Sequence, residues 1–324
     1  ILAVLAALAV AGLVQLWQVA GLVFLSGTCR ATLDPTMQAL IPNQVPREDL
    51  LNAFTLSAAT RHGGKLVLLV ASPLLAVDSV GVAGVLVMSA VLQLAGALSM
   101  ARVLTASRGE SGKERGMARA IVEGLVHIYT NRTIALFVIL AAFHCALVMS
   151  FDAILPVLSR QELGAIDGST LGYLVMAFGA GSMVGLLLTA GVRDEARKGQ
   201  ILMWTAVGSG LTPMMLALSD NVPLAVIASA GMGASQATFM ALTNTYVQAI
   251  APDRLRGRIG SLYTLHAGGV MAFSNLGYGF AADVFSAPPI LFVTGALFVV
   301  VLVSLSVGQP VLRRVYRTGE VVAA

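Results

Sequence analysis

Ten apolar segments, most of them long enough to cross a lipid bilayer as helices, make up the larger part of this sequence. A helix needs about 20 mainly apolar residues to span the hydrocarbon core. In that core the backbone can satisfy its hydrogen bonds only as a helix or a closed barrel. The segments therefore predict an all-α membrane protein, with spans at residues 1–14, 16–40, 50–76, 80–103, 133–157, 169–192, 199–218, 221–248, 258–282 and 286–308.

The basic residues lie almost entirely on one side of this predicted membrane. Loops on the other side carry only Arg160. Because Lys and Arg collect in cytoplasmic loops, we expect a multi-pass protein with its C-terminus in the cytoplasm and no nucleic-acid partner. The basic residues of the first side are Arg47, Arg102, Arg108, Lys113, Arg115, Arg119, Arg132, Arg193, Arg197, Lys198, Arg254, Arg256, Arg258, Arg313, Arg314 and Arg317.

Several classes of protein are disfavoured by what the sequence lacks. Charged residues make up 11% of the chain, against about 25% in soluble domains. The cysteines, Cys29 and Cys145, lie inside apolar segments, and the four histidines are isolated, so we expect no metal site and no cofactor. Neither the phosphate-binding loop of ATPases nor the serine motif of hydrolases occurs. We expect neither an ATP-driven protein nor an enzyme.

The chain contains an internal repeat with an offset of 206 residues. Residues 27–32 (Gly-Thr-Cys-Arg-Ala-Thr) match residues 233–238 (Gly-Ala-Ser-Gln-Ala-Thr), and Val45-Pro46 matches Ala251-Pro252. Four spans precede the polar segment 104–132 and six follow it. We therefore expect two further helices, on about 70 residues, before residue 1 of a parent chain with two sixfold halves.

This repeat predicts four regions. Residues 1–103 are the remainder of an N-terminal bundle with four helices, and residues 104–132 are a cytoplasmic linker. Within the linker, residues 117–129 have apolar side chains at helical spacing and fit an amphipathic helix along the membrane surface. Residues 133–308 form a C-terminal bundle of six helices, and residues 309–324 form a cytoplasmic tail.

Short motifs in a characteristic order extend over essentially the whole chain. They are Pro35, residues 40–53, Leu155-Pro156, Leu171-Gly172-Tyr173 with Gly179, Gly181 and Gly185, and residues 252–258 (Pro-Asp-Arg-Leu-Arg-Gly-Arg). In these motifs the chain resembles the major facilitator superfamily, and within it the bacterial efflux permeases that include macrolide and siderophore exporters. The run Ala71-Ser72-Pro73 departs from the Gly-Pro of that branch's antiporter signature.

The resemblance implies a fold and a function. The fold is of the major facilitator type, with ten of twelve transmembrane helices in two pseudo-symmetric bundles. The function is export of a small amphiphilic compound by alternating access, coupled to H+, by a monomer in the bacterial inner membrane. Its partners are the lipid bilayer and a small-molecule substrate. Two alternatives stay open: an uptake permease for a small anion, and a truncated, non-transporting membrane remnant.

Charged side chains inside predicted spans are the first candidates for function, because each costs about 2.5–3.5 kcal/mol at a helix centre. Arg30, Arg61 and Lys65 form a basic group at mid-depth that fits an anionic or polyhydroxylated solute. Alternatively, Arg30 pairs with Asp34 one turn on, and Arg61 and Lys65 neutralise acids elsewhere.

Polar residues of the other spans extend this set. His144, Gln236 and Asn244 are candidates for hydrogen bonds to the substrate, or for ties between helices. Asp34 and Asp152 are candidates for the coupling proton, although Asp152 also fits a wet interfacial position. Gly181 and Gly185 fit close helix packing.

Two cytoplasmic turns supply candidate gating residues. The first contains Arg193, Asp194 and Arg197, in a loop that resembles the gate element of the superfamily. The second contains Arg254, Arg256 and Arg258, which fit a clamp on a neighbouring helix C-terminus, a contact with anionic lipid, or a plain topology signal.

Overall fold

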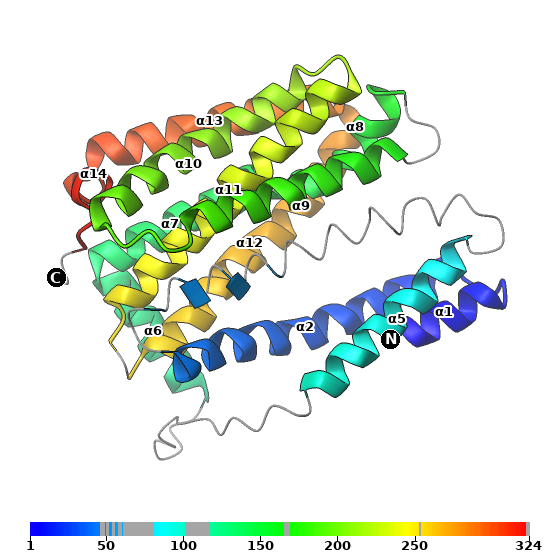
Figure 1. Cartoon of the computed structure of the whole chain (residues 1–324), viewed down its shortest axis with the longest axis horizontal. Coiled ribbons are helices and arrows are strands. Elements are labelled where there is room, and N and C mark those ends of the chain that lie inside the picture. Colours follow the sequence, from blue (N-terminus) through cyan, green and yellow to red (C-terminus); the bar gives the residue numbers. More distant parts are fainter. Residues whose placement is uncertain are drawn as a thin grey trace. The chain divides into compact units, whose positions relative to one another are not determined.

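The computed structural model describes residues 1–45, 49, 52–53, 56–57, 60, 81–100, 117–164, 169–252 and 254–321. Within these ranges, all regular structure is helical (Figure 1), with twelve α-helices and one short 3-10 helix. The predicted all-α class is confirmed for this part of the chain. Arg61, Lys65 and residues 104–116 of the predicted linker lie outside it.

The helices fall into two compact units, which we describe separately. The first unit contains α1 (Leu2–Val10), α2 (Leu16–Gln44) and α5 (Gly81–Met100), and α1 packs against α5. The elements of the second unit are α6 (Met117–Thr130), α7 (Arg132–Leu147), η3 (Met149–Ala153), α8 (Leu155–Gln161), α9 (Ser169–Thr189), α10 (Glu195–Ala217), α11 (Val222–Ile250), α12 (Arg256–Val284), α13 (Ala287–Gly308) and α14 (Pro310–Thr318).

The sequence repeat extends to the bounds of the helices. Adding the offset of 206 to the bounds of α2, residues 16 and 44, gives 222 and 250, which are the bounds of α11. The same addition carries the first residue of α5, Gly81, to the first residue of α13, Ala287. The four predicted regions and the pseudo-symmetry of the two bundles stay predictions.

Four helices of the described part are long and apolar enough to cross a membrane. They are Arg132–Ala153, Thr170–Thr189, Val222–Ile250 and Ala287–Gly308, and they coincide with four of the ten predicted spans. α10 and α12 have 23 and 29 residues and occupy two further predicted spans, but they carry more polar side chains.

The predicted span at 133–157 is not one continuous α-helix. α7 ends at Leu147, and the chain continues as the 3-10 helix η3 and then as α8, which has Pro156 in its first turn. A proline cannot donate a backbone hydrogen bond, so it suits the start of a helix rather than its interior. The Ser150 hydroxyl donates to the Cys145 carbonyl over 2.9 Å and satisfies an acceptor at the break.

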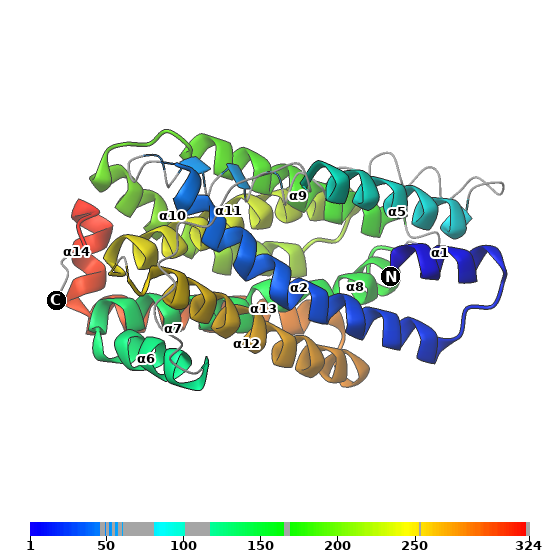
Figure 2. The ribbon, with the colours of Figure 1, turned by 90° about the horizontal axis from the view of Figure 1, so that it is seen from below.

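α11 is the central helix of the second unit and packs against α7, α9 and α10 (Figure 2). Glycines bring α9 and α11 to the closest approach. A Cβ on Gly181 would lie 1.9 Å from the Ala230 carbonyl oxygen, and one on Gly233 would lie 1.9 Å from that of Phe178. The predicted packing role of Gly181 and Gly185 is confirmed, because a Cβ on Gly185 would also lie 2.6 Å from the Ala234 oxygen.

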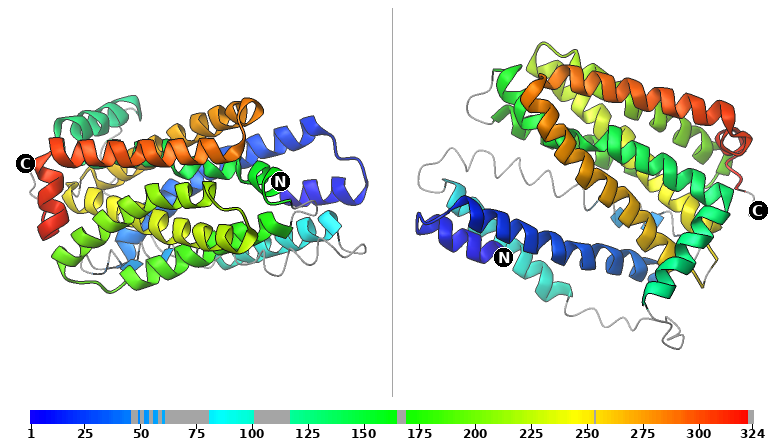
Figure 3. Two further views of the ribbon diagram at one scale, coloured as in Figure 1. Left: turned by 90° about the horizontal axis from the view of Figure 1, so that it is seen from above. Right: turned by 180° about the vertical axis from the view of Figure 1, so that it is seen from behind.

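The predicted C-terminal tail contains a helix that the sequence analysis missed. α14 lies across the end of the second unit (Figure 3) and buries Leu312, Val315 and Tyr316. Its backbone touches α10, since a Cβ on Gly199 would lie 2.0 Å from the Val315 oxygen. The helix ends at Gly319, whose positive φ of 69° suits glycine.

Candidate functional site

Ring contacts between α7 and α11 fix the register of these two helices. Phe137 stacks on Tyr246 with ring centroids 5.4 Å apart, and His144 lies 4.5 Å from Phe239. Seven residues forward on α7 thus correspond to seven residues backward on α11, so the helices are antiparallel. By the same register Gln236 is level with Leu147, one helical turn from His144.

α12 reaches the same level of the bundle. The Tyr278 hydroxyl donates to the Leu147 carbonyl over 2.8 Å, and Asn275 precedes Tyr278 by about one turn. The tyrosine side chain is long, however, and the Ser150 hydroxyl lies 3.5 Å from the Met271 carbonyl oxygen, which places Asn275, one turn after Met271, nearer the level of η3 than that of His144. His144 and Gln236 come from two helices to a similar depth. We call these two residues the buried polar layer.

The buried polar layer contains polar atoms that have no hydrogen-bond partner among the described residues. These atoms are both nitrogens of His144 and both amide heteroatoms of Gln236. His144 and Gln236 are fully buried. An unsatisfied buried polar group costs about 1–3 kcal/mol, so such groups are unusual in a region that serves only packing.

The surroundings of His144 are aromatic. Its ring lies between Phe239 of α11 and Phe298 of α13, with centroid distances of 4.5 and 5.2 Å. Asn244, a further predicted substrate contact, lies two turns beyond Gln236 on α11, and its Oδ1 is also buried without a partner in the described part of the chain. The predicted substrate roles of His144, Gln236 and Asn244 stay predictions.

The predicted charged site is only partly described. Arg30 and Asp34 lie on α2, but their side chains are outside the description, as are Arg61 and Lys65. Asp152 lies in η3 and is exposed. The proposed pair of Arg30 and Asp34 and the two proton-carrying candidates stay predictions.

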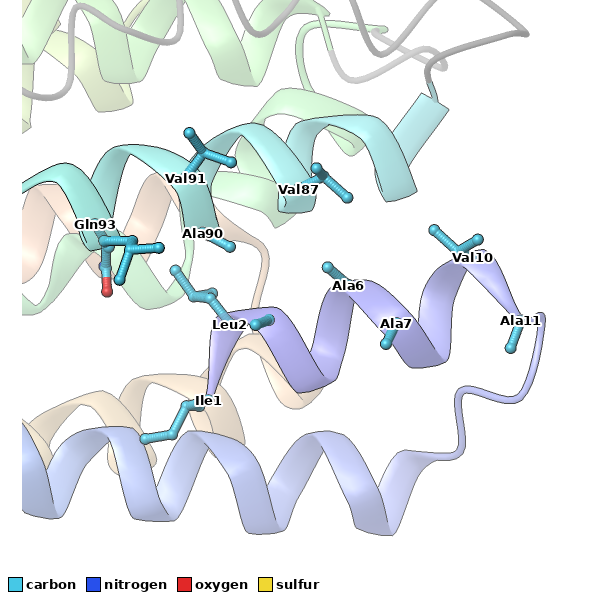
Figure 4. A pocket seen from close by; sticks show the side chains of 12 residues that line it. Ile1, Leu2, Ala6, Ala7, Val10, Ala11, Val87, Ala90, Val91 and Gln93 are labelled. Atoms are coloured by element: carbon cyan, nitrogen blue, oxygen red, sulfur yellow. The ribbon is translucent and has the colours of Figure 1, made fainter.

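The first unit contributes a cavity of about 780 Å³ between α1 and α5 (Figure 4). Apart from Gln93, the side chains that line it are apolar. The cavity offers a hydrophobic compound a surface but no charged group to orient it. Sequence reasoning did not select any of its residues.

The second predicted gating turn forms an ion-pair cluster with a residue that sequence reasoning missed. Arg254 Nη1 lies 2.6 Å from Glu123 Oε1, and Arg258 Nη1 lies 2.8 Å from Glu123 Oε2. We call these three residues the Glu123 clamp. The clamp joins α6, the amphipathic helix of the predicted linker, to the start of α12. The sequence could have pointed to Glu123, because it is the single acidic residue of the predicted amphipathic helix, residues 117–129.

Arg256 of the same turn caps a neighbouring helix. Its Nε donates to the Gln248 carbonyl over 3.1 Å, in the last turn of α11. Carbonyl groups at a helix C-terminus have no partner within the helix and carry partial negative charge. The predicted clamp on a helix C-terminus is confirmed for Arg256, and gating by the three arginines stays a prediction.

The first predicted gating turn starts α10. Asp194 is the N-cap and accepts a hydrogen bond from the Ala196 backbone N–H over 3.0 Å. Arg197 Nε lies 3.6 Å from Asp194 Oδ2, and Arg193 is exposed. The adjacent Gly191, with φ of 82°, donates its N–H to Asn52 Oδ1 over 2.8 Å. These contacts give Asp194 a structural role, and its gating role stays a prediction.

The Glu123 clamp should respond to charge removal and to strongly acidic pH. The hydrogen bond from Arg254, together with the charges of Arg254 and Arg258, lowers the pKa of Glu123 below its ordinary value of 4.5. A lowered pKa means that the clamp stabilises the fold fully above that ordinary value and is lost only as the pH falls below it.

We therefore expect Glu123→Gln to speed hydrogen exchange of the α6 amides about two- to fivefold at pH 7, a small effect because the pairs are partly exposed. Mass spectrometry of the α6 peptides measures this exchange. Glu320→Gln, at an exposed acid of the tail, is the control and should leave α6 unchanged. Equal exchange in Glu123→Gln and the parent protein would show that the clamp does not hold α6.

Comparison with known proteins identifies the family. The sequence matches the family described as transmembrane secretion effector over residues 1–315, which is nearly the whole chain. No curated protein matches it. This family is one of transporters and not of enzymes, as we expected from the sequence. With its helical fold and long apolar spans, the chain belongs to the transmembrane secretion effector family of the major facilitator superfamily.

Proposed function

We propose that this protein exports a small amphiphilic compound of the drug, macrolide or siderophore type by alternating access, in exchange for protons. The description of its family, transmembrane secretion effector, supports export rather than uptake. The resemblance to efflux permeases supports a bacterial inner-membrane location, with the C-terminus in the cytoplasm and a monomeric state.

The observation that carries the proposal is the buried polar layer. Four uncharged polar atoms without described partners, on His144 of α7 and Gln236 of α11, lie within about one helical turn of each other. In transporters with two repeated bundles, substrate sites lie near the middle of the membrane between the repeats. We assign Gln236, Asn244 and His144 to the substrate's hydrogen-bonding groups, and Arg30, Arg61 and Lys65 to its negatively charged groups.

Coupling to protons needs a carboxylate whose pKa changes between the two states of the transporter. Asp34 and Asp152 are the proposed carriers. The proposed gate comprises the two cytoplasmic turns, with Arg193, Asp194 and Arg197 in one and Arg254, Arg256 and Arg258 in the other. Neutralising the coupled carboxylate should abolish gradient-driven transport and spare the exchange of solute.

Inverted membrane vesicles test direction and coupling together. We expect an acidic vesicle lumen to drive accumulation of at least one member of a panel of radiolabelled macrolides and siderophores, and a protonophore to abolish it. Asp34→Asn or Asp152→Asn should remove this accumulation but keep exchange. Unchanged accumulation in both variants would exclude both acids. Loss of a preloaded anion from the vesicles would favour the uptake permease, and no flux of any compound would favour the non-transporting remnant.

A further inference from the structure

α14 is held on the second unit by one face and by both of its ends. Its apolar side chains are buried, and the helix packs against α10 and α13. At its start, Arg132 Nη2 donates to Gln309 Oε1 over 2.8 Å. At its end, Gly319 lies too close to the Glu195 carbonyl group of α10 for a Cβ to fit. These contacts fix the rotation of α14 about its own axis, so its opposite face has a defined direction.

The opposite face of α14 carries three exposed arginines, which are Arg313, Arg314 and Arg317. We call these three residues the α14 arginines. Arg317 is three positions from Arg314 and four from Arg313, so the three side chains share one side of the helix. That side lies opposite the fully buried Leu312 and Val315. Within the described ranges, none of the α14 arginines forms an ion pair.

This arrangement is not explained by the stability of α14 itself. Like charges four residues apart on a helix repel each other. A positive charge is favourable in the last turn of a helix, where Arg317 lies, but Arg313 and Arg314 precede that turn. The two acids at the start of α10 pair with basic residues of their own turn. The α14 arginines therefore fit a negatively charged partner from outside the described part of the chain.

The start of α14 lies where two spans end. The span α13 ends at Gly308, and α14 begins at Pro310. Arg132, which bonds to Gln309, is the first residue of the span Arg132–Ala153. α14 then lies across the end of the second unit at this level (Figure 3). A helix at the end of a span lies among the lipid headgroups, which form a layer about 5–7 Å thick on each side of the hydrocarbon.

We propose that the α14 arginines bind the headgroups of anionic phospholipids, such as phosphatidylglycerol. A guanidinium group presents two parallel N–H donors to a phosphate group. The attraction of basic residues to an anionic membrane falls off within a Debye length of the surface, about 8 Å at physiological ionic strength, and the α14 arginines lie within that distance. Phosphatidylcholine also has a phosphate group but no net charge, so this surface should prefer the anionic lipid.

Tryptophan quenching by brominated lipids measures which lipid lies next to α14, with no assay of transport. Val311→Trp places a reporter one turn from Arg314, in a background with Trp17→Phe and Trp204→Phe, which removes both native tryptophans. The vesicles contain equal amounts of phosphatidylglycerol and phosphatidylcholine, with bromine on one lipid or on the other. We expect a relative binding constant of about ten in favour of phosphatidylglycerol at about 0.1 M salt. It should fall at least about threefold at 1 M salt, where the Debye length is about 3 Å.

Two charge variants of this reporter protein test whether the α14 arginines cause the preference. Their joint replacement by glutamine should lower the relative binding constant to about one. Replacement of Arg108, Lys113 and Arg115 of the predicted linker by glutamine removes the same charge and should leave the preference about tenfold. An equal loss in both variants would show that the lipid responds to total charge and not to α14, and would overturn the proposal. Val300→Trp, at an exposed position of α13, should report no preference.

Three other results would also overturn the proposal. Equal quenching by both brominated lipids would show that α14 does not select anionic headgroups. Loss of the preference in inorganic phosphate, but not in chloride of the same ionic strength, would assign the α14 arginines to a soluble phosphate compound. Quenching by aqueous iodide alone would place α14 away from lipid, with its arginines free for an acidic protein. Thr318→Trp, at an exposed position, repeats the test if Val311→Trp does not fold.

Discussion

Gly233→Ala is expected to lower the melting temperature of the protein by about 5–10 °C, the shift that corresponds to a few kcal/mol in a domain of this size. The new methyl group would lie 1.9 Å from the Phe178 carbonyl oxygen, and the same distance separates a Cβ on Gly181 from the Ala230 oxygen. A backbone oxygen cannot rotate away as a side chain can, so α9 and α11 must move apart. Overpacking costs about 1–3 kcal/mol in ordinary cores. We expect a cost at the upper end of this range, because the clash is with a backbone atom.

The control for this prediction is a glycine with free space around it. A Cβ on Gly268 of α12 would meet nothing within 4 Å. Because alanine favours a helix over glycine by up to about 1 kcal/mol, Gly268→Ala should leave the melting temperature unchanged or raise it slightly. Thermal unfolding of both variants in the same detergent checks the difference. Equal melting temperatures would show that the α9 and α11 crossing tolerates a methyl group.

The sequence predicted those features of the fold that depend on composition and repetition. Long apolar segments require helices in a bilayer, and the repeat at an offset of 206 residues, found in short motifs, also relates the bounds of α2 and α11 in the structure. The predicted spans at 16–40 and 221–248 ended earlier than these two helices do. A clamp on a helix C-terminus was one of three alternatives for Arg256, and the structure has this contact, because a basic residue just after a helix finds unpaired carbonyl groups nearby.

Other features depend on contacts that a linear pattern does not specify. Glu123 is separated from Arg254 by 131 residues, so charge counting located the arginines but not their acidic partner. The break after Leu147 and the helix α14 follow from local backbone geometry and from packing on α10. Hydropathy averages over many residues and does not report either feature.

Gln236→Leu is expected to make the fold more stable and transport about tenfold slower. The Gln236 amide is fully buried, and both of its polar atoms lack a partner among the described residues. Leucine has a similar volume and no polar group, so the variant should regain part of the about 1–3 kcal/mol that an unsatisfied amide costs. If the amide binds substrate, transport should fall about tenfold, the loss that corresponds to about 1.4 kcal/mol of binding free energy.

Thr243→Val provides the matched control on the same helix. The Thr243 hydroxyl is equally buried but satisfied, by Tyr263 Oη at 2.8 Å and the Phe239 carbonyl at 2.9 Å. Its removal should lower stability by about 1 kcal/mol and leave the transport rate per folded molecule unchanged. Melting temperature and vesicle transport, measured on both variants, separate the two roles. If Gln236→Leu lowers stability, the amide is a structural tie between helices. If it raises stability and keeps full transport, the buried polar layer lies outside the substrate path, since a group that costs stability and binds nothing has no part in transport.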